Sequence, residues 1–164
     1  SINARRVAWD GKRWRLGRRL FLPLYGLEPA ASEEPAALGK DELARLPDDA
    51  ARAVALALVK AVAMTEPGGW DVFLAAVSPA GFGFEGELHP WKTLKETTSG
   101  YVPVAEYLSL GDGPWRVGIP VKKSGEAWIY RGSGYGKARL VVLRKQKDGA
   151  WKLTGLKERD LGSP

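Results

Sequence analysis

The sequence predicts an α+β fold in which helices come first and an antiparallel sheet follows. Residues 50–64 are apolar at thirteen of fifteen positions, as in a helix that is buried on most sides. From residue 101 onward, apolar and polar residues alternate with the period of strands. Helical segments followed by a run of strands are typical of the α+β class. We expect the helices to pack on a curved antiparallel sheet, with a small β-hairpin unit before them.

The first 25 residues form the predicted hairpin unit. In VAWDGKRWRL, residues 7–16, a DG turn separates two short runs that each carry a tryptophan. Residues 18–25 resemble a third strand, which Pro23 restricts to a sheet edge. Residues 26–40 are rich in Pro, Ala and Glu without periodicity, which predicts a linker.

Residues 41–157 form the predicted main domain, and residues 158–164 a tail. DELARL (41–46) predicts a short helix that Pro47 ends. Asp48 and Asp49 then supply a cap and favourable charge for a helix that runs to about Met64. A second, shorter helix is predicted over 70–77, after the EPGG breaker.

Alternation predicts only strands in the remainder of the domain. In the first of them Val102, Val104, Glu106 and Leu108 are expected on one face. In the second, Trp115, Val117, Ile119 and Val121 are expected on one face. The predicted strands are 101–108, 115–121, 126–131, 137–147 and 150–156.

Residues 41–157 resemble the nuclear transport factor 2-like superfamily. The resemblance rests on the order of elements, on a short second helix that ends in LAAVSPAGF, and on the closing strands ARLVVLRKQKDGAWKLTGL. It implies a cone-like fold in which a curled sheet wraps the long helix and leaves an open pocket. Members include isomerases, dehydratases, secretion-machinery scaffolds and catalytically silent binding domains, so the resemblance alone does not fix a function.

Composition excludes several chemistries. The chain has no cysteine, which excludes disulfides, thiol nucleophiles and cysteine metal ligands. His89 is the only histidine, so we expect a loop histidine and neither a metal site nor a serine triad. No cofactor is predicted. Asn3, Gln146 and Met64 are each the only residue of their type, a scarcity of thermolabile side chains typical of thermophile proteins.

The stretch RGSGYGKARL, residues 131–140, raises the question of a phosphate-binding loop. A Walker-type loop needs a glycine at position 131 and Ser or Thr at position 138, where this chain has Arg131 and Ala138. Such a loop also leads into a helix, whereas ARLVVLRK predicts a strand. The glycines therefore indicate a corner between two strands.

The leading function is a non-catalytic module that binds a small apolar ligand or a protein partner, with a homo-oligomer left open. If the predicted cone is open, aromatic side chains line an apolar pocket. The candidate pocket residues are Trp70, Phe73, Tyr101, Tyr107, Trp115 and Trp128.

The first alternative is an isomerase-like or dehydratase-like enzyme. It requires a buried carboxylate with a raised pKa that faces Tyr101 or Tyr107 in the pocket. The candidate bases are Asp71, Glu85, Glu87 and Glu106. Their spacing does not single out a pair.

The second alternative is a module that binds nucleic acid or another polyanion. The net charge is +6, and residues 1–19 carry seven basic side chains against Asp10 alone. Residues 137–159 are basic again. The candidate contacts are Arg13, Arg15, Arg18, Arg19, Lys137 and Arg139. The simpler interpretation of both basic segments is an ordinary charged surface.

No apolar run approaches the roughly 20 residues that span a bilayer, so we expect a soluble domain. The chain begins at SINARR without a methionine, which leaves open a removed leader or membrane anchor. The sequence does not indicate a cellular compartment.

Overall fold

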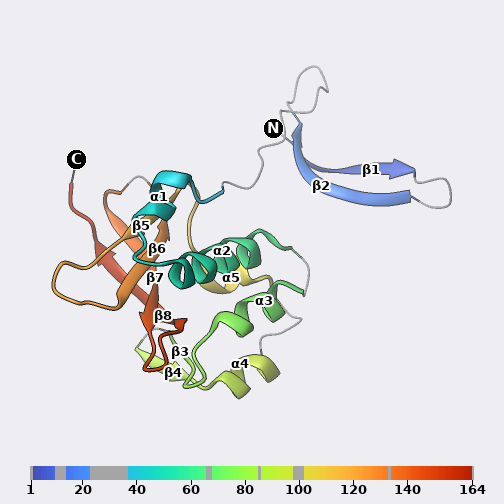
Figure 1. Cartoon of the computed structure of the whole chain (residues 1–164). Coiled ribbons are helices and arrows are strands. Elements are labelled where there is room, and N and C mark those ends of the chain that lie inside the picture. The colour runs from blue at the N-terminus through green and yellow to red at the C-terminus, as the bar shows by residue number, and fades with distance from the viewer. Residues whose placement is uncertain are drawn as a thin grey trace. The chain divides into compact units, whose positions relative to one another are not determined.

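The computed structural model describes residues 2–9, 14–22, 37–65, 68–84, 86–97, 102–132 and 134–163. The chain divides into two compact units, Ser1–Pro35 and Ala36–Pro164 (Figure 1). Each unit has its own sheet.

Within its described residues the first unit is an antiparallel pair of strands, β1 (Ile2–Trp9) and β2 (Trp14–Leu22), so residues 18–22 continue β2 and do not begin the predicted third strand. Trp9 lies opposite Trp14, and the register shifts once, between Arg5 and Val7. The side chains of this unit lie outside the described part of the chain.

The second unit combines helices with a six-stranded sheet, which confirms the α+β class. The strand order is β4-β3-β8-β7-β6-β5. All neighbours pair antiparallel except β3 and β8, which are parallel where Gly83 meets Gly155, so the sheet is mixed. The elements are α1 (Lys40–Ala44), α2 (Asp49–Ala63), α3 (Gly68–Ala76), β3 (Phe82–Phe84), β4 (Glu87–His89), α4 (Trp91–Thr97), α5 (Val104–Leu108), β5 (Trp115–Gly118), β6 (Glu126–Arg131), β7 (Lys137–Lys145) and β8 (Trp151–Asp160).

The long helix α2 starts as predicted. Asp48 is its N-cap, and the Asp48 carboxylate accepts hydrogen bonds from Ala51 N at 2.8 Å and from Trp151 Nε1 at 3.1 Å. The same side chain therefore caps the helix and ties it to β8. These hydrogen bonds, that from Ala51 first, hold the pKa of Asp48 below its usual value.

The expectation that α2 is buried on most sides holds only in part. Val54, Ala57 and Val59 are half-buried against the core, but one side of the helix faces solvent. One stripe is buried (Ala51, Ala55, Leu58, Ala61 and Val62), while Ala53, Leu56 and Lys60 are exposed. Most of the exposed apolar positions are alanines, whose small side chains expose little apolar area to water.

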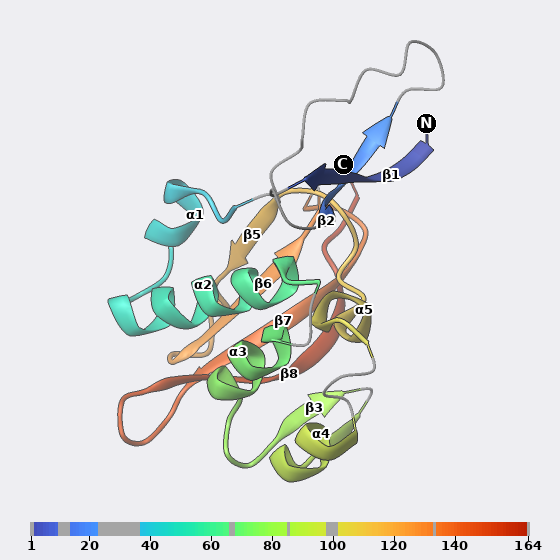
Figure 2. The ribbon, with the colours of Figure 1, turned by 90° about the vertical axis from the view of Figure 1, so that its right-hand side faces the viewer.

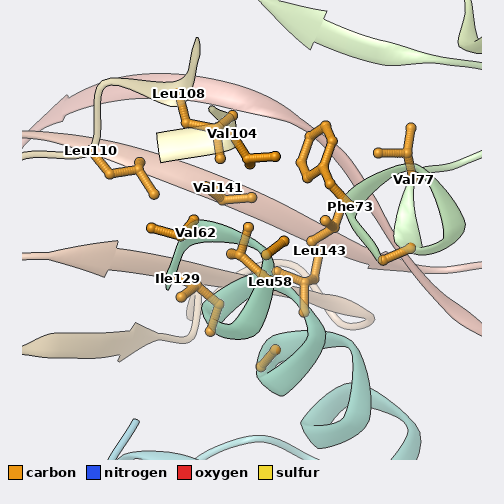
Figure 3. Close-up of a cluster of buried hydrophobic side chains, with 14 of the residues drawn as sticks. Leu58, Val62, Phe73, Val77, Val104, Leu108, Leu110, Ile129, Val141 and Leu143 are labelled. Carbon is orange, nitrogen blue, oxygen red and sulfur yellow. The ribbon is translucent and has the colours of Figure 1, made fainter. Parts of the chain in front are cut away.

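The main core lies between the helices and one face of the sheet. Figure 2 shows α2, α3 and α5 on the same side of the strands β5–β8. In this layer Leu58 of α2 and Phe73 of α3 pack with Ile129, Val141 and Leu143 from the sheet (Figure 3). Leu38, which falls in the predicted linker, is also buried in this core.

The predicted strand 101–108 is wrong, because the described part of this segment contains the short helix α5. Pro103 precedes the helix in an extended conformation, and its fixed φ suits a helix start. Val104 and Leu108, four residues apart, are buried, whereas Val102 and Glu106 are exposed. Burial thus follows the helical spacing and not the alternation.

Three further segments differ from the prediction, one of them β8, which runs to Asp160, past its predicted end at 156 and into the predicted tail 158–164. Residues 91–97, where only strands were expected, form α4, whose Trp91 Nε1 donates to Leu74 O of α3 at 2.9 Å. The predicted strand 115–121 ends at Gly118, and Val121 is 99% exposed. Pro120 has no N–H to donate to a neighbouring strand, which accounts for the early end.

The sheet edge at β5 is covered by a side chain from α1. The Val117 N–H, on the edge strand, donates to Glu42 Oε2 at 2.7 Å. Arg116 Nη1 lies 3.5 Å from Glu42 Oε1. One carboxylate therefore satisfies a backbone group that a further strand would otherwise use.

The glycine-rich stretch 131–140 is the predicted corner. It runs from the end of β6 into β7, and Gly132, Gly134 and Gly136 have φ values of +138°, +87° and +75°. A strand and not a helix follows it, so the phosphate-loop geometry is not formed.

Candidate ligand-binding cleft

An aromatic cluster fills the space between α3, α5 and the sheet. Trp70 and Phe73 of α3 are buried, with ring centroids 5.5 Å apart and edge-on geometry. Phe73 meets Phe82 of β3 at 5.4 Å, and Trp70 meets Tyr107 of α5 at 5.2 Å. Trp70 and Phe73, two of the predicted pocket residues, are therefore packed into the core.

A three-layer stack lies at one end of this cluster. The half-buried Tyr107 ring stacks on Phe84 at 5.3 Å with an interplanar angle of 25°. The guanidinium carbon of Arg139, from β7, lies 5.3 Å from the centre of the Phe84 ring. Arg139 Nη1 also donates to Leu108 O at 2.8 Å, which connects β7 to α5. Burial raises the pKa of the Tyr107 hydroxyl.

A cleft of about 540 Å³ opens beside this stack, within the size range of small-molecule sites. Its described lining comprises Gly86 from the β3–β4 turn, Arg139, and Leu156, Lys157 and Glu158 of β8. Glu158 Oε1 lies 3.8 Å from Arg139 Nε, and the Glu158 side chain is 70% exposed against 24% for Arg139. The described lining thus combines the apolar side chain of Leu156 with a half-buried cation that pairs with the exposed Glu158.

A second hollow of about 430 Å³ lies at the C-terminal end of α5. Its lining includes the exposed carboxylates of Glu106 and Asp112. Arg131, which borders it, donates from Nε to Gly113 O at 3.0 Å and lies over the Trp115 ring at 5.1 Å. Both carboxylates are exposed to water, which weakens their interaction with a bound charge. This hollow is therefore a weaker candidate site than the Arg139 cleft.

The other predicted pocket residues do not gather at the cleft. Trp115 is buried under Arg131. Trp128 belongs to a separate cluster with Leu140 and Val142, on the sheet face opposite α2. Tyr101 lies outside the described residues. The structure therefore brings together Trp70, Phe73 and Tyr107 alone among the described members of the set.

Asp71, Glu87 and Glu106, the candidate bases that the structure describes, are not the buried carboxylate that the enzymatic alternative requires. All three are exposed, and Glu85 lies outside the described residues. His89, predicted in a loop, lies in β4 with its ring 6.2 Å from that of Phe84. Within the described ranges, no group of three or more His, Asp or Glu side chains is placed to hold a metal ion.

Of the candidate polyanion contacts, Lys137 is exposed, whereas Arg139 contacts Phe84, Leu108 and Glu158 inside the domain. Arg15, Arg18 and Arg19 lie in β2, where side chains are not described, and Arg13 lies outside the described residues. Convergence of the two basic segments thus stays a prediction.

Sequence reasoning missed Leu156 and Glu158 as cleft residues, and Phe84 as the ring that Arg139 contacts. Arg139 and Glu158 face each other across β7 and β8. That pairing depends on the register of β7 and β8, which shifts between Val142 and Leu143. Composition does not reveal such a shift. The alternating charges of Lys157-Glu158-Arg159-Asp160 were the available signal.

Glu126 of β6 is a buried carboxylate on the sheet face opposite α2. It accepts hydrogen bonds from Trp128 Nε1 at 2.9 Å and Arg144 Nε at 3.0 Å, and Lys157 Nζ lies 3.6 Å away. Desolvation alone would raise its pKa, but the hydrogen bonds from Arg144 and Trp128 and the nearby cations outweigh burial and lower the pKa.

This pairing predicts a pH-dependent contribution to stability. A carboxylate with a lowered folded-state pKa stabilises above its unfolded pKa, and the stabilisation is lost as pH falls through the folded value. The stability difference between the native protein and Glu126→Gln should therefore be largest above about pH 5 and shrink at more acidic pH. Urea unfolding at several pH values measures it. A difference independent of pH would contradict the ionised, paired carboxylate.

No described helix is long and apolar enough to cross a membrane.

The chain matches no protein-family model, no curated protein and no solved structure.

Proposed function

We propose that the second unit is a non-catalytic binding module of cone-like fold, and that its cleft takes an anionic group attached to an apolar body. The fold proposal rests on the resemblance to the nuclear transport factor 2-like superfamily. The strand order β4-β3-β8-β7-β6-β5, with α2, α3 and α5 on one face, supports it. The aromatic cluster fills the interior, which leaves the end of the cone at Arg139 as the binding position.

The observation that carries the proposal is the environment of Arg139. Its guanidinium lies over Phe84 on the wall of a cleft that Leu156 also lines. Guanidinium groups bind carboxylates with good geometry, and a partly buried guanidinium does so more strongly than an exposed one. The exposed Glu158 carboxylate already pairs with this guanidinium, with Oε1 3.8 Å from Arg139 Nε. An incoming anion would replace a weak internal ion pair.

The ligand can be a small molecule or an acidic side chain of a protein partner, because both present the same carboxylate. Benzoate is a suitable probe, since it joins a carboxylate to a ring of the size that the cleft accepts. Benzamide, of the same shape without the charge, is its control. In ¹⁵N-labelled protein, benzoate should shift the amide signals of Gly86, Leu156 and Glu158, and benzamide should not.

Replacing Glu158 with glutamine should strengthen benzoate binding. The substitution removes an internal competitor, and because exposed ion pairs contribute roughly 0.2–1 kcal/mol, the gain should be about 1.4- to fivefold. Glu106→Gln, which removes an exposed carboxylate from the second hollow, should leave the affinity nearly unchanged. Equal shifts with benzamide, or an affinity that does not respond to Glu158→Gln, would sink the proposal.

A further inference from the structure

The charges of β8 are segregated by face. Residues 157–160 read Lys-Glu-Arg-Asp, and successive side chains of a strand point to opposite faces. Glu158 contacts Arg139 on the helix-covered face. Lys157 Nζ and the guanidinium carbon of Arg159 lie 4.4 Å and 4.7 Å from the ring centre of Trp128 on the opposite face, which we call the outer face. The cations of this segment therefore share the outer face.

Neighbouring strands extend this positive charge. Arg144 of β7 and Arg116 of β5 also point to the outer face, with side chains 56% and 41% exposed. Two acids pair with these cations: Glu126, 3% exposed, with Arg144 and Lys157, and Glu42, 18% exposed, with Arg116. Solvent therefore meets the cations more than the carboxylates.

Arg159 differs from the other cations of the outer face. Lys157 and Arg144 pair with Glu126, and Arg116 with Glu42. Among the described residues, no acidic side chain lies within ion-pair distance of Arg159, whose recorded contact is the Trp128 ring. Its charge is therefore available to an external anion.

We propose that the outer face binds the phosphate backbone of nucleic acid without reading bases. Arginine forks match phosphate oxygens in geometry. Trp128 is 8% exposed beneath two cations, so its ring has no free face on which a base of a single strand could stack. The neighbouring side chains of Leu140 and Val142 are also buried, so neither can insert into a bilayer. A duplex carries one negative charge per about 1.7 Å of its axis. Closely spaced cations therefore meet a higher density of negative charge on a duplex than on an acidic peptide.

Two charge reversals at adjacent register positions test the proposal. Arg159 lies opposite Ala138 on β7, and Lys137 lies opposite Asp160, so the two cations are neighbours that belong to opposite faces. Arg159→Glu and Lys137→Glu change the net charge equally. Binding of a fluorescent DNA duplex of about 20 base pairs to the full chain should weaken roughly tenfold in Arg159→Glu and at most about twofold in Lys137→Glu.

The salt dependence should change in the same direction. The slope of log affinity against log salt should fall by about one for Arg159→Glu and stay near the native value for Lys137→Glu. Thermal unfolding establishes that both variants are folded. Both keep the basic N-terminal segment, so their difference reports on the sheet alone.

Three results would overturn the proposal. Equal weakening in both variants would show that overall charge, and not the outer face, attracts DNA. Tighter binding of polyglutamate or of phosphatidylserine vesicles than of the duplex would assign the face to another class of polyanion. Absence of duplex binding at low salt would leave the outer face without this function.

Discussion

Replacing Phe73 with alanine is expected to lower the free energy of unfolding by about 3–5 kcal/mol. Phe73 is fully buried and joins two neighbours through edge-on ring contacts, Trp70 at 5.5 Å and Phe82 at 5.4 Å. Truncation removes these contacts and leaves a cavity that the surrounding helix and strand fill only in part. Urea unfolding followed by circular dichroism measures the change.

The matched control for this prediction is Leu56→Ala. Leu56 is 46% exposed on α2, so its truncation should lower stability by less than about 1 kcal/mol. The comparison also bears on function. If Phe73→Ala were as mild as the control, the interior would be a loose pocket able to hold a ligand, and the proposal that binding occurs only at the Arg139 cleft would be wrong.

Replacing Gly155 with alanine is expected to destabilise the domain by about 1–3 kcal/mol. A Cβ atom at this position would lie 2.9 Å from Gly83 O and 3.2 Å from Gly83 Cα. Both atoms are backbone, so the contact is relieved only if β3 moves away from β8. Since β3 carries Phe84 and leads into Gly86, the shift should also weaken benzoate binding at the cleft.

Gly83→Ala is the control across the same strand pair. A Cβ atom at position 83 would meet Thr154 O at 3.7 Å, an ordinary contact, so the change in stability should stay below about 1 kcal/mol. Equal losses of stability in the two variants would mean that replacing either glycine of this strand pair is destabilising, and that the close approach of β3 and β8 at Gly155 is not the cause.

Local signals predicted the parts of the fold that local physics determines. Asp48 marks the start of α2 because a side-chain oxygen satisfies a free N–H of the first turn. The strands β6, β7 and β8 could be predicted from the sequence because turn sequences separate their apolar runs.

The segment that became α5 shows where such signals fail. Val104 and Leu108 fit a period of two and a spacing of four equally well, and only the packing against α2 and α3 decides which positions are buried. The cleft was hidden for a similar reason. Arg139, Phe84 and Glu158 come from separate strands, and only the sheet register brings them together.

The carboxylate of Glu42 limits the addition of a further strand at the edge of β5. Exposed N–H and C=O groups on a sheet edge template the addition of strands from other molecules, the route by which many β proteins aggregate. Glu42 engages the Val117 N–H of that edge from a helix of only five residues, α1. Solubility at this edge therefore depends on a segment outside the sheet, and a truncation that begins after Glu42 would expose the edge to other chains.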